Sequence, residues 1–468
     1  MSIQINLTPR VATVIQEVDV LVVGGGPAGI GAAISASYDG SNVLLLEKNG
    51  FLGGNITKSY VEGCNYFLNG TGFEPGGVWA KMENGYKAIY GRGHDLRPGT
   101  TFRFSSEYLK IYLDKFLKEH GVEVLFHSFV NEVVIEEQKI KAVIIQTKQG
   151  PQAVVAKTIV DCSGDADVAF AAGIPFEQGR ATDGLCQPGT LSFRVAGVDA
   201  PSLLADGKDV LNEVGLVYRE NYRAGITGLS CKRQDLPFGR LTPGGQVSYL
   251  NYPCSYGVDA TDIASLSQAE QECRGYIEEM LDYARKNMYG FEKVELANIA
   301  TEISFRDSRR IKGRYQLTIE DLTSARHFED CIAVYPQFYD MLSPDAYMDG
   351  DGTVEGRGYE GHIYSLPKDD TLFQIPYRCL IPEGIDNLLV AGRSISAEHV
   401  AQSGIRAISC CMATGEAAGA AAALASKNQI ATDKVSIMQL QDCLRKQGAK
   451  LPPKNTSLSG QLTVEQLD

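Results

Sequence analysis

An apolar run that breaks into three consecutive glycines constrains the fold of this chain more than any other feature. Residues 18–23 read VDVLVV, a short apolar segment typical of a buried parallel strand. The run ends at Gly24-Gly25-Gly26, and a small-residue stretch with helical character begins at Pro27. A strand, a glycine turn and a helix in this order predict the opening unit of a parallel α/β sheet.

The same glycines have the spacing of a dinucleotide-binding fingerprint. In a GxGxxG pattern the glycines allow a tight turn, a bare backbone beside a pyrophosphate, and close packing of helix on strand. The helix N-terminus adds free N–H groups and a positive dipole end for the phosphates. A second strand over 42–46 ends at Glu47, 21 residues after Gly26, where an acidic side chain binds ribose hydroxyls. We expect these residues to hold an adenine dinucleotide: Gly24, Gly26, Pro27, Ala28, Gly29 and Glu47.

Charge and hydropathy argue against two classes of binding partner, nucleic acids and membranes. The 468 residues exceed one typical domain, and 44 basic against 57 acidic side chains give a net charge of −13. This balance argues against nucleic acid or an anionic membrane as a partner. The first residues lack the basic region and apolar core of a secretion signal, and no run approaches about 18 uninterrupted apolar residues. We therefore expect a cytoplasmic protein without membrane insertion, and its oligomeric state stays open.

The cysteines and histidines show no clustering. Eleven cysteines occur without a CxxC or CxxxxC pair, which indicates reduced thiols that are mostly buried as small hydrophobes. Iron–sulfur ligation needs clustered cysteines, and the six histidines are equally dispersed, so we expect no metal site. Cys410-Cys411 is the one adjacent pair. It is open to a redox role, but its small-residue surroundings favour a packed helix. Asp349–Gly352 superficially resembles a calcium loop, with its Glu and Gly at the wrong offsets.

The middle of the first half predicts a β-meander. Ser105 or Ser106 can cap a helix that Gly121 ends. Four strand-like runs follow, and turn residues separate the last three, which indicates antiparallel pairing. The runs are 122–126, 131–136, 141–147 and 153–160. The last one leads into a small-residue turn, where Gly164 and Asp165 are expected to face the ligand, because ligands bind beyond the carboxyl ends of parallel strands.

The strand-glycine-helix pattern is missing from residues 174–374 and occurs again after residue 387. Residues 174–374 carry helical patterns near 207–223 and 267–290 and strands near 190–195 and 315–319, which predicts a mixed α+β substrate domain. At Asn387–Arg393 an apolar strand again ends in glycine, and a small-residue helix over 405–426 follows. We therefore divide the chain into a nucleotide domain over 1–173, a substrate or cap domain over 174–374, and a return to the nucleotide domain with a C-terminal helix over 375–468.

Three blocks of sequence carry a resemblance to a known family. They are VVGGGPAGIGAA with Glu47 and Gly53-Gly54, SRRIKGRYQLTIED at Ser308–Asp321, and the long block Ile375–Ala425. The chain is similar to the FAD-dependent oxidoreductase family of flavoproteins, which is distantly related to fumarate reductase and succinate dehydrogenase flavoproteins. The resemblance implies an α/β fold, with a doubly wound Rossmann-type FAD-binding domain, an inserted meander and a second α+β domain. It also implies an enzyme that binds FAD.

The resemblance implies where the cofactor lies. The adenosine would lie at Gly24–Glu47 and the isoalloxazine near Gly392 and Ser403–Arg406, with the following helix N-terminus aimed at its pyrimidine edge. Arg393 would meet the pyrophosphate, with a surface salt bridge as the alternative. The further expected contacts are Lys48, Gly53, Gly54, Asn55, Thr57, Gly392, Ser403, Gly404 and Arg406. A histidine that carries the flavin covalently in succinate dehydrogenase is missing from the segment GGNITKS, which implies non-covalent FAD.

A basic cluster and a few proton donors are the catalytic candidates. Residues 306–314 place five cations in nine positions of an acidic chain, between apolar neighbours. If the segment is helical, Arg306, Arg310 and Arg314 share one face. A solvated charge run is the plain interpretation, whereas guanidinium groups also suit a carboxylate substrate or FAD phosphate. We favour Arg309 and Arg310 as site residues.

Proton transfer and the overall reaction complete the prediction. Tyr66, Arg309 and His399 are candidate proton donors, with a loop-bonded histidine as the alternative for His399. We expect hydride transfer between FAD and a small polar organic molecule, by CH–OH or CH–CH oxidation or by reduction of an activated double bond. No second GxGxxG follows a strand, so the electron partner is NAD(P)H, a quinone, a protein or oxygen. The alternative is an electron-transfer subunit of a larger redox complex.

Overall fold

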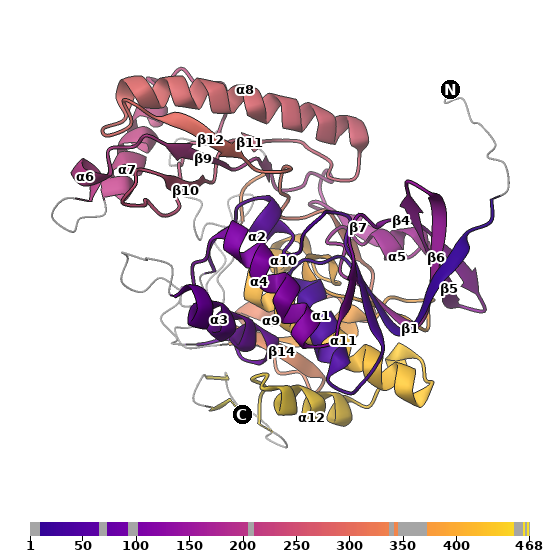
Figure 1. The fold of residues 1–468 in the computed structure, drawn as a ribbon. Helices are drawn as coiled ribbons and strands as arrows, with labels where there is room; N and C mark the ends of the chain where they lie inside the picture. Colours follow the sequence, from indigo (N-terminus) through magenta and orange to yellow (C-terminus); the bar gives the residue numbers. More distant parts are fainter. Residues whose placement is uncertain are drawn as a thin grey trace.

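A parallel sheet forms the centre of the first domain in the computed structural model (Figure 1). The model describes residues 10–64, 73–91, 102–204, 210–336, 341–344, 372–453, 462–463 and 466–467. Within the seven-stranded sheet, neighbouring strands run parallel in the order β3-β2-β1-β6-β16. These strands are β1 (Thr13–Val23), β2 (Val43–Leu46), β3 (Glu123–Leu125), β6 (Gly150–Asp161) and β16 (Leu388–Val390). The final strand of the sheet therefore comes from the returning C-terminal segment.

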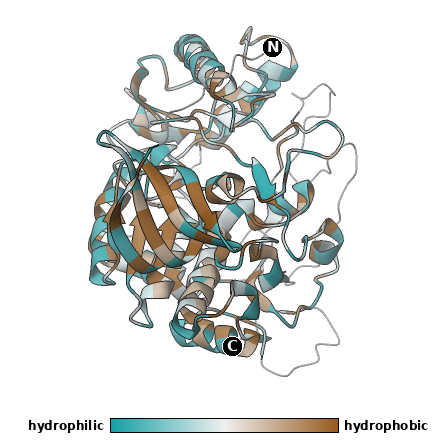
Figure 2. Cartoon of the chain, turned by 90° about the vertical axis from the view of Figure 1, so that its right-hand side faces the viewer, coloured by the Kyte–Doolittle hydropathy of each residue, from teal (hydrophilic) through white to brown (hydrophobic). Residues whose placement is uncertain are grey.

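The predicted meander is confirmed. β4 (Phe129–Glu136) pairs antiparallel with β5 (Lys139–Thr147), which pairs antiparallel with β6. The run before it, β3, instead pairs in parallel with β2, so it belongs to the nucleotide-binding half. Figure 2 shows the apolar colour concentrated along strands of this sheet, as expected because β2 and the ends of β1 and β6 are buried.

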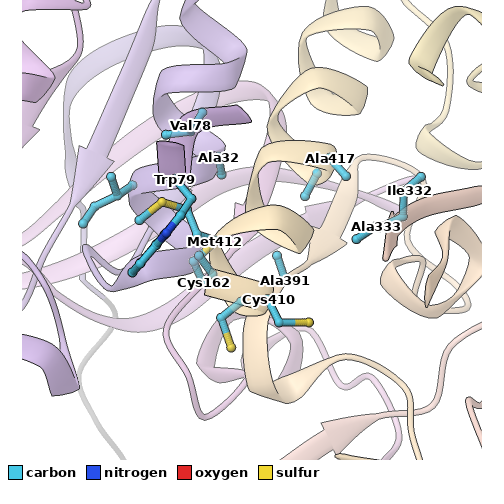
Figure 3. Close-up of a cluster of buried hydrophobic side chains, with 14 of the residues drawn as sticks. Ala32, Val78, Trp79, Cys162, Ile332, Ala333, Ala391, Cys410, Met412 and Ala417 are labelled. Carbon is cyan, nitrogen blue, oxygen red and sulfur yellow. The ribbon is translucent and has the colours of Figure 1, made fainter. Parts of the chain in front are cut away.

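Two helices rich in small residues pack closely against each other in the first domain. α1 (Pro27–Ser37) lies against α11 (Ile408–Asn428), with Ala32, Met412 and Ala417 in one buried cluster (Figure 3). A Cβ on Gly415 would lie 1.9 Å from the carbonyl oxygen of Ala28, so only glycine permits this approach. Among the described residues, α11 is the one helix long and apolar enough to cross a membrane by length and composition. Its most apolar window is 83% buried inside the fold, so core packing accounts for its composition.

The remaining helices of the first domain surround this pair. α3 (Gly77–Tyr90) and α12 (Ile437–Gln447) both contact α11, and α4 (Ser106–Glu119) begins after Ser105 as its N-cap. Short elements occupy the carboxyl side of the sheet, where the cavity lies. They are α2 (Asn55–Lys58), α5 (Asp167–Ala171), the 3-10 turn η4 (Gly392–Ser394) and α10 (His399–Ile405).

A second hydrophobic core is built from residues 191–305, with Tyr60 of the first domain packed into it. Its sheet has the order β10-β9-β12, covered by the long helix α8 at the top of Figure 1. The elements are β8 (Gly189–Thr190), β9 (Phe193–Ala196), α6 (Ala200–Leu203), α7 (Val210–Arg223), β10 (Val247–Leu250), β11 (Cys254–Ser255), α8 (Ile263–Asn287) and β12 (Glu295–Ile299).

The segment after this core returns to the first domain. β13 (Arg309–Ile311) pairs with β7 (Phe176–Gln178), and β14 (Cys331–Tyr335) pairs with β15 (Phe373–Pro376). Residues 317–335 contribute to the hydrophobic core that contains α1 and α11. The domain limits at 173 and 374 stay predictions.

Two local expectations were wrong, and one condition is not met. The basic cluster does not form the helix in which Arg306, Arg310 and Arg314 would share one face, because Arg309–Ile311 pairs as a strand with β7. Residues 315–319 form no strand. Leu317 makes a single bridge to Ala397, and Thr318 caps the helix α9 (Ile319–Thr323). The small-residue helix is divided in two, because the backbone at Ala407 is extended (ψ 148°) between α10 and α11.

All eleven cysteines are free thiols, and ten of them are buried, as their scattered spacing predicted. Cys410 and Cys411 lie inside α11 and belong to its packed core. Within the described ranges, no group of three or more His, Cys, Asp or Glu side chains is arranged to hold a metal ion. The calcium-like sequence at 349–352 lies outside the described residues.

Candidate functional site

A cavity of about 270 Å³ opens at the carboxyl ends of the parallel strands, between the two cores. Val23, Leu46, Cys162 and Ala391, at or just beyond the ends of β1, β2, β6 and β16, all line it. Ligands in open α/β sheets bind at this edge. The second domain contributes Asn251 and residues 304–306 to the same lining.

The three fingerprint glycines have three different physical roles. Gly24 has φ +101°, and a Cβ there would lie 2.4 Å from the carbonyl oxygen of Cys162. Gly29 packs the helix on the strand, since its Cβ would lie 1.7 Å from the carbonyl oxygen of Gly24. A Cβ on Gly26 would have no heavy atom nearer than Gly54 Cα at 3.9 Å. The backbone is therefore bare toward the cavity at the position where the fingerprint brings a pyrophosphate close.

A second glycine pair faces this loop. Gly53 (φ +110°) and Gly54 (φ +54°) adopt backbone conformations that favour glycine. A Cβ on Gly54 would lie 3.0 Å from Gly26 Cα, so the two glycine loops approach closely. Thr57 is fully buried and donates from Oγ1 to Leu52 O at 2.6 Å, which fixes the turn rather than lining the cavity.

Glu47 lies at the cavity, at the end of β2. Its Oε2 accepts a hydrogen bond from Gly25 N at 2.7 Å, and its Oε1 accepts one from Asn49 N at 2.8 Å. The carboxylate therefore bridges the fingerprint loop and the turn after β2. Oε1 also accepts a hydrogen bond from Asn49 Nδ2 at 2.9 Å, so about one of the four acceptor sites of an ionised carboxylate is left for a ribose hydroxyl.

Arg393 holds the turn after β6. Its Nη2 pairs with Asp165 Oδ1 at 2.7 Å, and its Nε and Nη1 donate to Gly164 O and Phe305 O at 2.7 and 3.0 Å. Burial would raise the pKa of Asp165, but Arg393 and Ser308 outweigh it and bring the pKa to about 2. Arg393 is thus a partly buried ion-pair partner of Asp165, and it also lines the cavity.

Arg309 lies behind the cavity wall. Its guanidinium stacks on Phe170, with 4.0 Å to the ring centroid, and its Nη1 pairs with Asp167 Oδ1 at 3.2 Å. Asp167 lines the cavity. Burial, followed by the charges of Asp165 and Asp161, raises the pKa of Asp167 to about 6.

Two lysines meet one carboxylate across the domain boundary. Lys58 pairs with Glu302, and Lys48 Nζ lies 3.6 Å from the same Glu302 oxygen. Burial and the neighbouring Lys48 lower the pKa of Lys58. Thr301 N donates to Lys58 O at 2.8 Å, so the segment after β12 is tied to α2 by backbone as well as by charge.

The second domain supplies the opposite wall. Asn55 Nδ2 donates to Phe305 O at 3.3 Å, which places residues 304–306 against α2. Gln402 Nε2 donates to the carbonyl oxygens of Arg306 and Arg393, at 3.0 and 3.3 Å. Asn251 and Arg306 bring side chains from the second domain to the cavity.

The junction of α10 and α11 also faces the cavity. Arg406 follows the last residue of α10, and Ile408 and Cys411 lie in the first turn of α11; all three line the cavity. The expectation that Arg406 lies in the first turn of a helix was therefore wrong, because it caps the end of α10. His399 begins α10, and its Nε2 lies 2.6 Å from Asp307 Oδ2, with both side chains buried.

The structure brings most of the expected cofactor contacts together. Those that line the cavity are Gly24, Gly26, Pro27, Ala28, Glu47, Lys48, Gly54, Asn55, Gly164, Gly392, Arg393 and Arg406. Those that lie behind the lining are Gly29, Gly53, Thr57, Asp165, Ser403 and Gly404. Ser403 donates to Val400 O within α10.

The expected catalytic residues are placed differently. Arg310 is 2% exposed and donates to Ala397 O and Gly179 O, at 3.0 and 2.9 Å. Neither it nor Arg309 or His399 is among the lining residues. Tyr66 lies outside the described residues. Catalytic roles for these four residues stay predictions.

Several lining residues were missed by the sequence analysis. Lys58 follows Asn55 by one helical turn, which was a usable signal. Phe129 and Val130 begin the first strand of the meander and lie beside the Glu47 region, because Ser128 N donates to Glu47 O. Asn251 and Ser304 carry no motif. Only the packing of the second domain brings them here.

The chain was compared with known families and proteins. Residues 19–444 match the model of the FAD dependent oxidoreductase family. Thiamine thiazole synthase of Aeropyrum pernix is 28% identical over 159 residues, covering 31% of this chain and 54% of that protein. Digeranylgeranylglycerophospholipid reductase 2 of Methanopyrus kandleri is 29% identical over 151 residues, covering 32% and 38%. The matched segments thus span about half or less of these relatives.

The chain was also compared with solved structures, which are similar to it at low identity. A geranylgeranyl bacteriochlorophyll reductase-like protein from Thermoplasma acidophilum is 14% identical with a TM-score of 0.45, covering 93% of this chain and 84% of that one. The p-nitrophenol 4-monooxygenase of Pseudomonas putida is 11% identical with a TM-score of 0.45, covering 92% and 85%. With its family match over nearly the whole length and a glycine cradle that suits the cofactor, the chain belongs to the FAD-dependent oxidoreductase family and is an FAD enzyme.

Proposed function

We propose that this enzyme transfers hydride between non-covalently bound FAD and a small polar organic substrate, as a dehydrogenase or reductase. The observation that carries the proposal is a cavity that both domains line. One wall has the glycine loops of the nucleotide site, and the other has polar and charged side chains of the second domain. A substrate in such a cavity lies between the cofactor and residues outside the fingerprint.

The first wall suits FAD in its backbone and its charge. The N-terminus of α1 would donate backbone hydrogen bonds to the pyrophosphate beside the bare backbone at Gly26, and Glu47 would accept a hydrogen bond from a ribose hydroxyl. Lys48 and Lys58 add positive charge to the same lining. The protein's contribution is to bind and orient the cofactor, which itself supplies the hydride chemistry when bound.

The start of α11 supplies the electrostatic part of the site. This 21-residue helix begins at the cavity, with Ile408 and Cys411 in the lining, so the positive end of its dipole faces the ligand. Arg406 adds a full positive charge beside it. Together they stabilise negative charge on the cofactor or on a bound substrate.

Non-covalent binding is supported by the chemistry of the lining. Among the described residues, no histidine lines the cavity. Two thiols do, but burial raises the pKa of Cys411 to about 12 and that of Cys162 well above its usual range. Protonated thiols are poor nucleophiles, so a covalent bond from either sulfur to the flavin is disfavoured.

Release of the flavin and anaerobic reduction test this function. Denatured protein is expected to release FAD into the supernatant. Flavin retained on the polypeptide would contradict non-covalent binding. The purified chain is then mixed anaerobically with a panel of hydroxy acids, sugars and amines, which would reduce the flavin. Enoates are added to protein whose flavin has first been photoreduced, because they would reoxidise it. Bleaching or reoxidation of the flavin by one member, with turnover in the isolated monodisperse chain, is expected. A flavin that exchanges electrons only with a protein partner would favour an electron-transfer subunit instead.

A further inference from the structure

The lining of the cavity is positive within an acidic chain. Its charged members are Lys48, Lys58, Arg306, Arg393 and Arg406 against Glu47 and Asp167. The whole chain has a net charge of −13, so this excess of cations is local. A cleft with one sign of charge concentrates ligands of the opposite sign.

Three of these cations lie on the nucleotide side and have carboxylate partners there. Lys48 and Lys58 share Glu302, and Arg393 pairs with Asp165. Lys48 follows Glu47, and Lys58 lies four residues after Gly54, so both follow the two glycine loops that approach each other. This group accounts for the charge needed beside the pyrophosphate.

The other two lining cations, Arg306 and Arg406, both contact one short segment outside the lining, residues 187–190. Arg306 Nη1 donates to Pro188 O at 3.0 Å and to Thr190 Oγ1 at 2.9 Å. Arg406 Nη2 donates to Gln187 Oε1 at 3.4 Å. Both guanidinium groups therefore contact residues 187–190, one from the second domain and one from the α10–α11 junction.

This segment is held rigidly. The side chain of Gln187 is fully buried, and its backbone N–H donates to Asp307 Oδ1 at 2.8 Å. Asp307 also faces His399 at 2.6 Å, and Arg306 O accepts from Gln402. Asp307 thereby fixes the backbone of Gln187, whose side chain is the acceptor for Arg406. The guanidinium groups are set in place before any ligand arrives, which lowers the entropic cost of binding.

We propose that Arg306 and Arg406 together bind an oxyanion group of the substrate, a carboxylate or a phosphate, with Asn251 and Ser304 as neutral polar neighbours in the same lining. The inference rests on the proposed function, because it places the substrate beside the cofactor. Guanidinium groups match carboxylate and phosphate with two parallel hydrogen bonds. The substrate class is thus a small organic acid or phosphate ester rather than an uncharged lipid or aromatic compound.

The test is an anion titration of the FAD-loaded protein at constant ionic strength. The flavin difference spectrum is the signal that reports anion binding. Acetate, succinate and inorganic phosphate are the probes, with chloride as the reference salt. Wild-type protein is expected to give a saturable spectral change with either the carboxylates or phosphate, and the stronger series identifies the group. Arg306→Met and Arg406→Met are each expected to weaken this binding by about thirty-fold or more, the size seen when one partner of a buried charge pair is removed. Arg306→Lys keeps the charge without the guanidinium fork, and its anion affinity is expected to lie between those of the wild type and Arg306→Met.

Controls separate this inference from the proposed function. Arg274→Met removes a half-exposed cation on α8 and is expected to leave anion binding unchanged. FAD content and thermal unfolding are measured for every variant, so a misfolded variant is recognised and Arg306→Lys then carries the test. Protein that purifies without any flavin would contradict the proposed function. Full FAD content with no anion response, or wild-type response in both methionine variants, would overturn the anion site alone. Loss of anion binding in Arg309→Met, with unchanged binding in Arg306→Met, would overturn the proposed site and indicate one at Arg309 instead.

Discussion

The two walls of the cavity are built in opposite ways. The nucleotide wall comes mainly from backbone at Gly24–Gly29 and Gly53–Gly54, from segments that are local in sequence. The wall of the second domain comes from side chains at 251 and 304–306, which are brought together over long sequence distances. Backbone geometry leaves a spacing pattern in the sequence, whereas convergent side chains do not. The cofactor site is therefore readable from the chain, and the substrate site is not.

The walls also differ in what holds them. A packed helix pair, α1 on α11, supports the nucleotide wall, with glycine contacts that exclude any side chain. Ion pairs and hydrogen bonds across the domain boundary hold the other wall, among them Lys58–Glu302 and Arg393 with Phe305 O. Changes in the first wall should remove the cofactor, and changes in the second should alter the ligand that meets it.

The largest expected effect is at Gly26. Gly26→Val should give a folded protein that purifies without flavin, because the new side chain enters the space of the pyrophosphate while the nearest heavy atom to its Cβ is 3.9 Å away. The ratio of flavin to protein absorbance and the circular dichroism spectrum measure both points. Gly275→Val is the control, since a Cβ there meets nothing within 4 Å. Full flavin in Gly26→Val would break the assignment of this wall.

A buried carboxyl group in α11 gives the next effect. Glu416 is 2% exposed and accepts from Val78 N at 3.0 Å, and burial raises its pKa from 4.5 to about 7. Because the folded state binds this proton more tightly than the unfolded state, the contribution to stability is complete below pH 4.5. It is lost as the pH rises through 7 and the buried carboxyl group must ionise. At about 1.4 kcal/mol for each pKa unit, the loss is about 3 kcal/mol.

Glu416→Gln should therefore remove most of the fall in unfolding free energy between pH 4.5 and 7. Urea unfolding at a series of pH values measures it. Glu123→Gln, on the exposed side of β3, serves as the control. If the unfolding free energy of Glu416→Gln depends on pH as it does in the wild type, another group is responsible for the fall. The helix pair would then contain no buried carboxyl group with a raised pKa at Glu416.

Glu47→Ala should weaken FAD binding by about ten- to a hundred-fold without unfolding the protein. Hydrogen bonds to a charged group contribute about 1.5–3 kcal/mol each. The carboxylate also bridges Gly25 N and Asn49 N, so part of the loss comes from a looser fingerprint loop. Fluorescence titration of FAD gives the affinity, with the exposed Glu119→Ala as a matched control. Unchanged affinity would mean that the ribose lies elsewhere.

The smallest effect is expected at Lys312. This lysine is 58% exposed and lies 3.8 Å from Glu177, a surface pair that contributes about 0–1 kcal/mol. Lys312→Met should change thermal stability little and leave both FAD affinity and the anion response intact. A clear loss of anion binding would show that the basic cluster acts as one unit, which would weaken the contrast between the two walls.

Sequence patterns predicted the nucleotide half in some detail. The spacing of Gly24, Gly26, Gly29 and Glu47 located one wall, and turn residues located the meander, because both depend on backbone conformation within short segments. The basic cluster was located from its charge, but its conformation was left open. Its strand form depends on pairing with β7, more than a hundred residues earlier.

Sequence alone determined the parallel sheet and the fingerprint, since each rests on local periodicity or on residue types at fixed spacing, and its resemblance to a known family indicated the family. Tertiary structure decided which arginines reach the cavity, where the 405–426 helix divides, and that Asn251 and Lys58 belong to the site. Arg309 and Arg310 are anchored by Asp167 and by backbone carbonyls, whereas Arg306, three residues earlier, lines the cavity. Neighbouring residues in a run of like charges differ only in the partners that distant segments bring to them, and no local pattern records those partners.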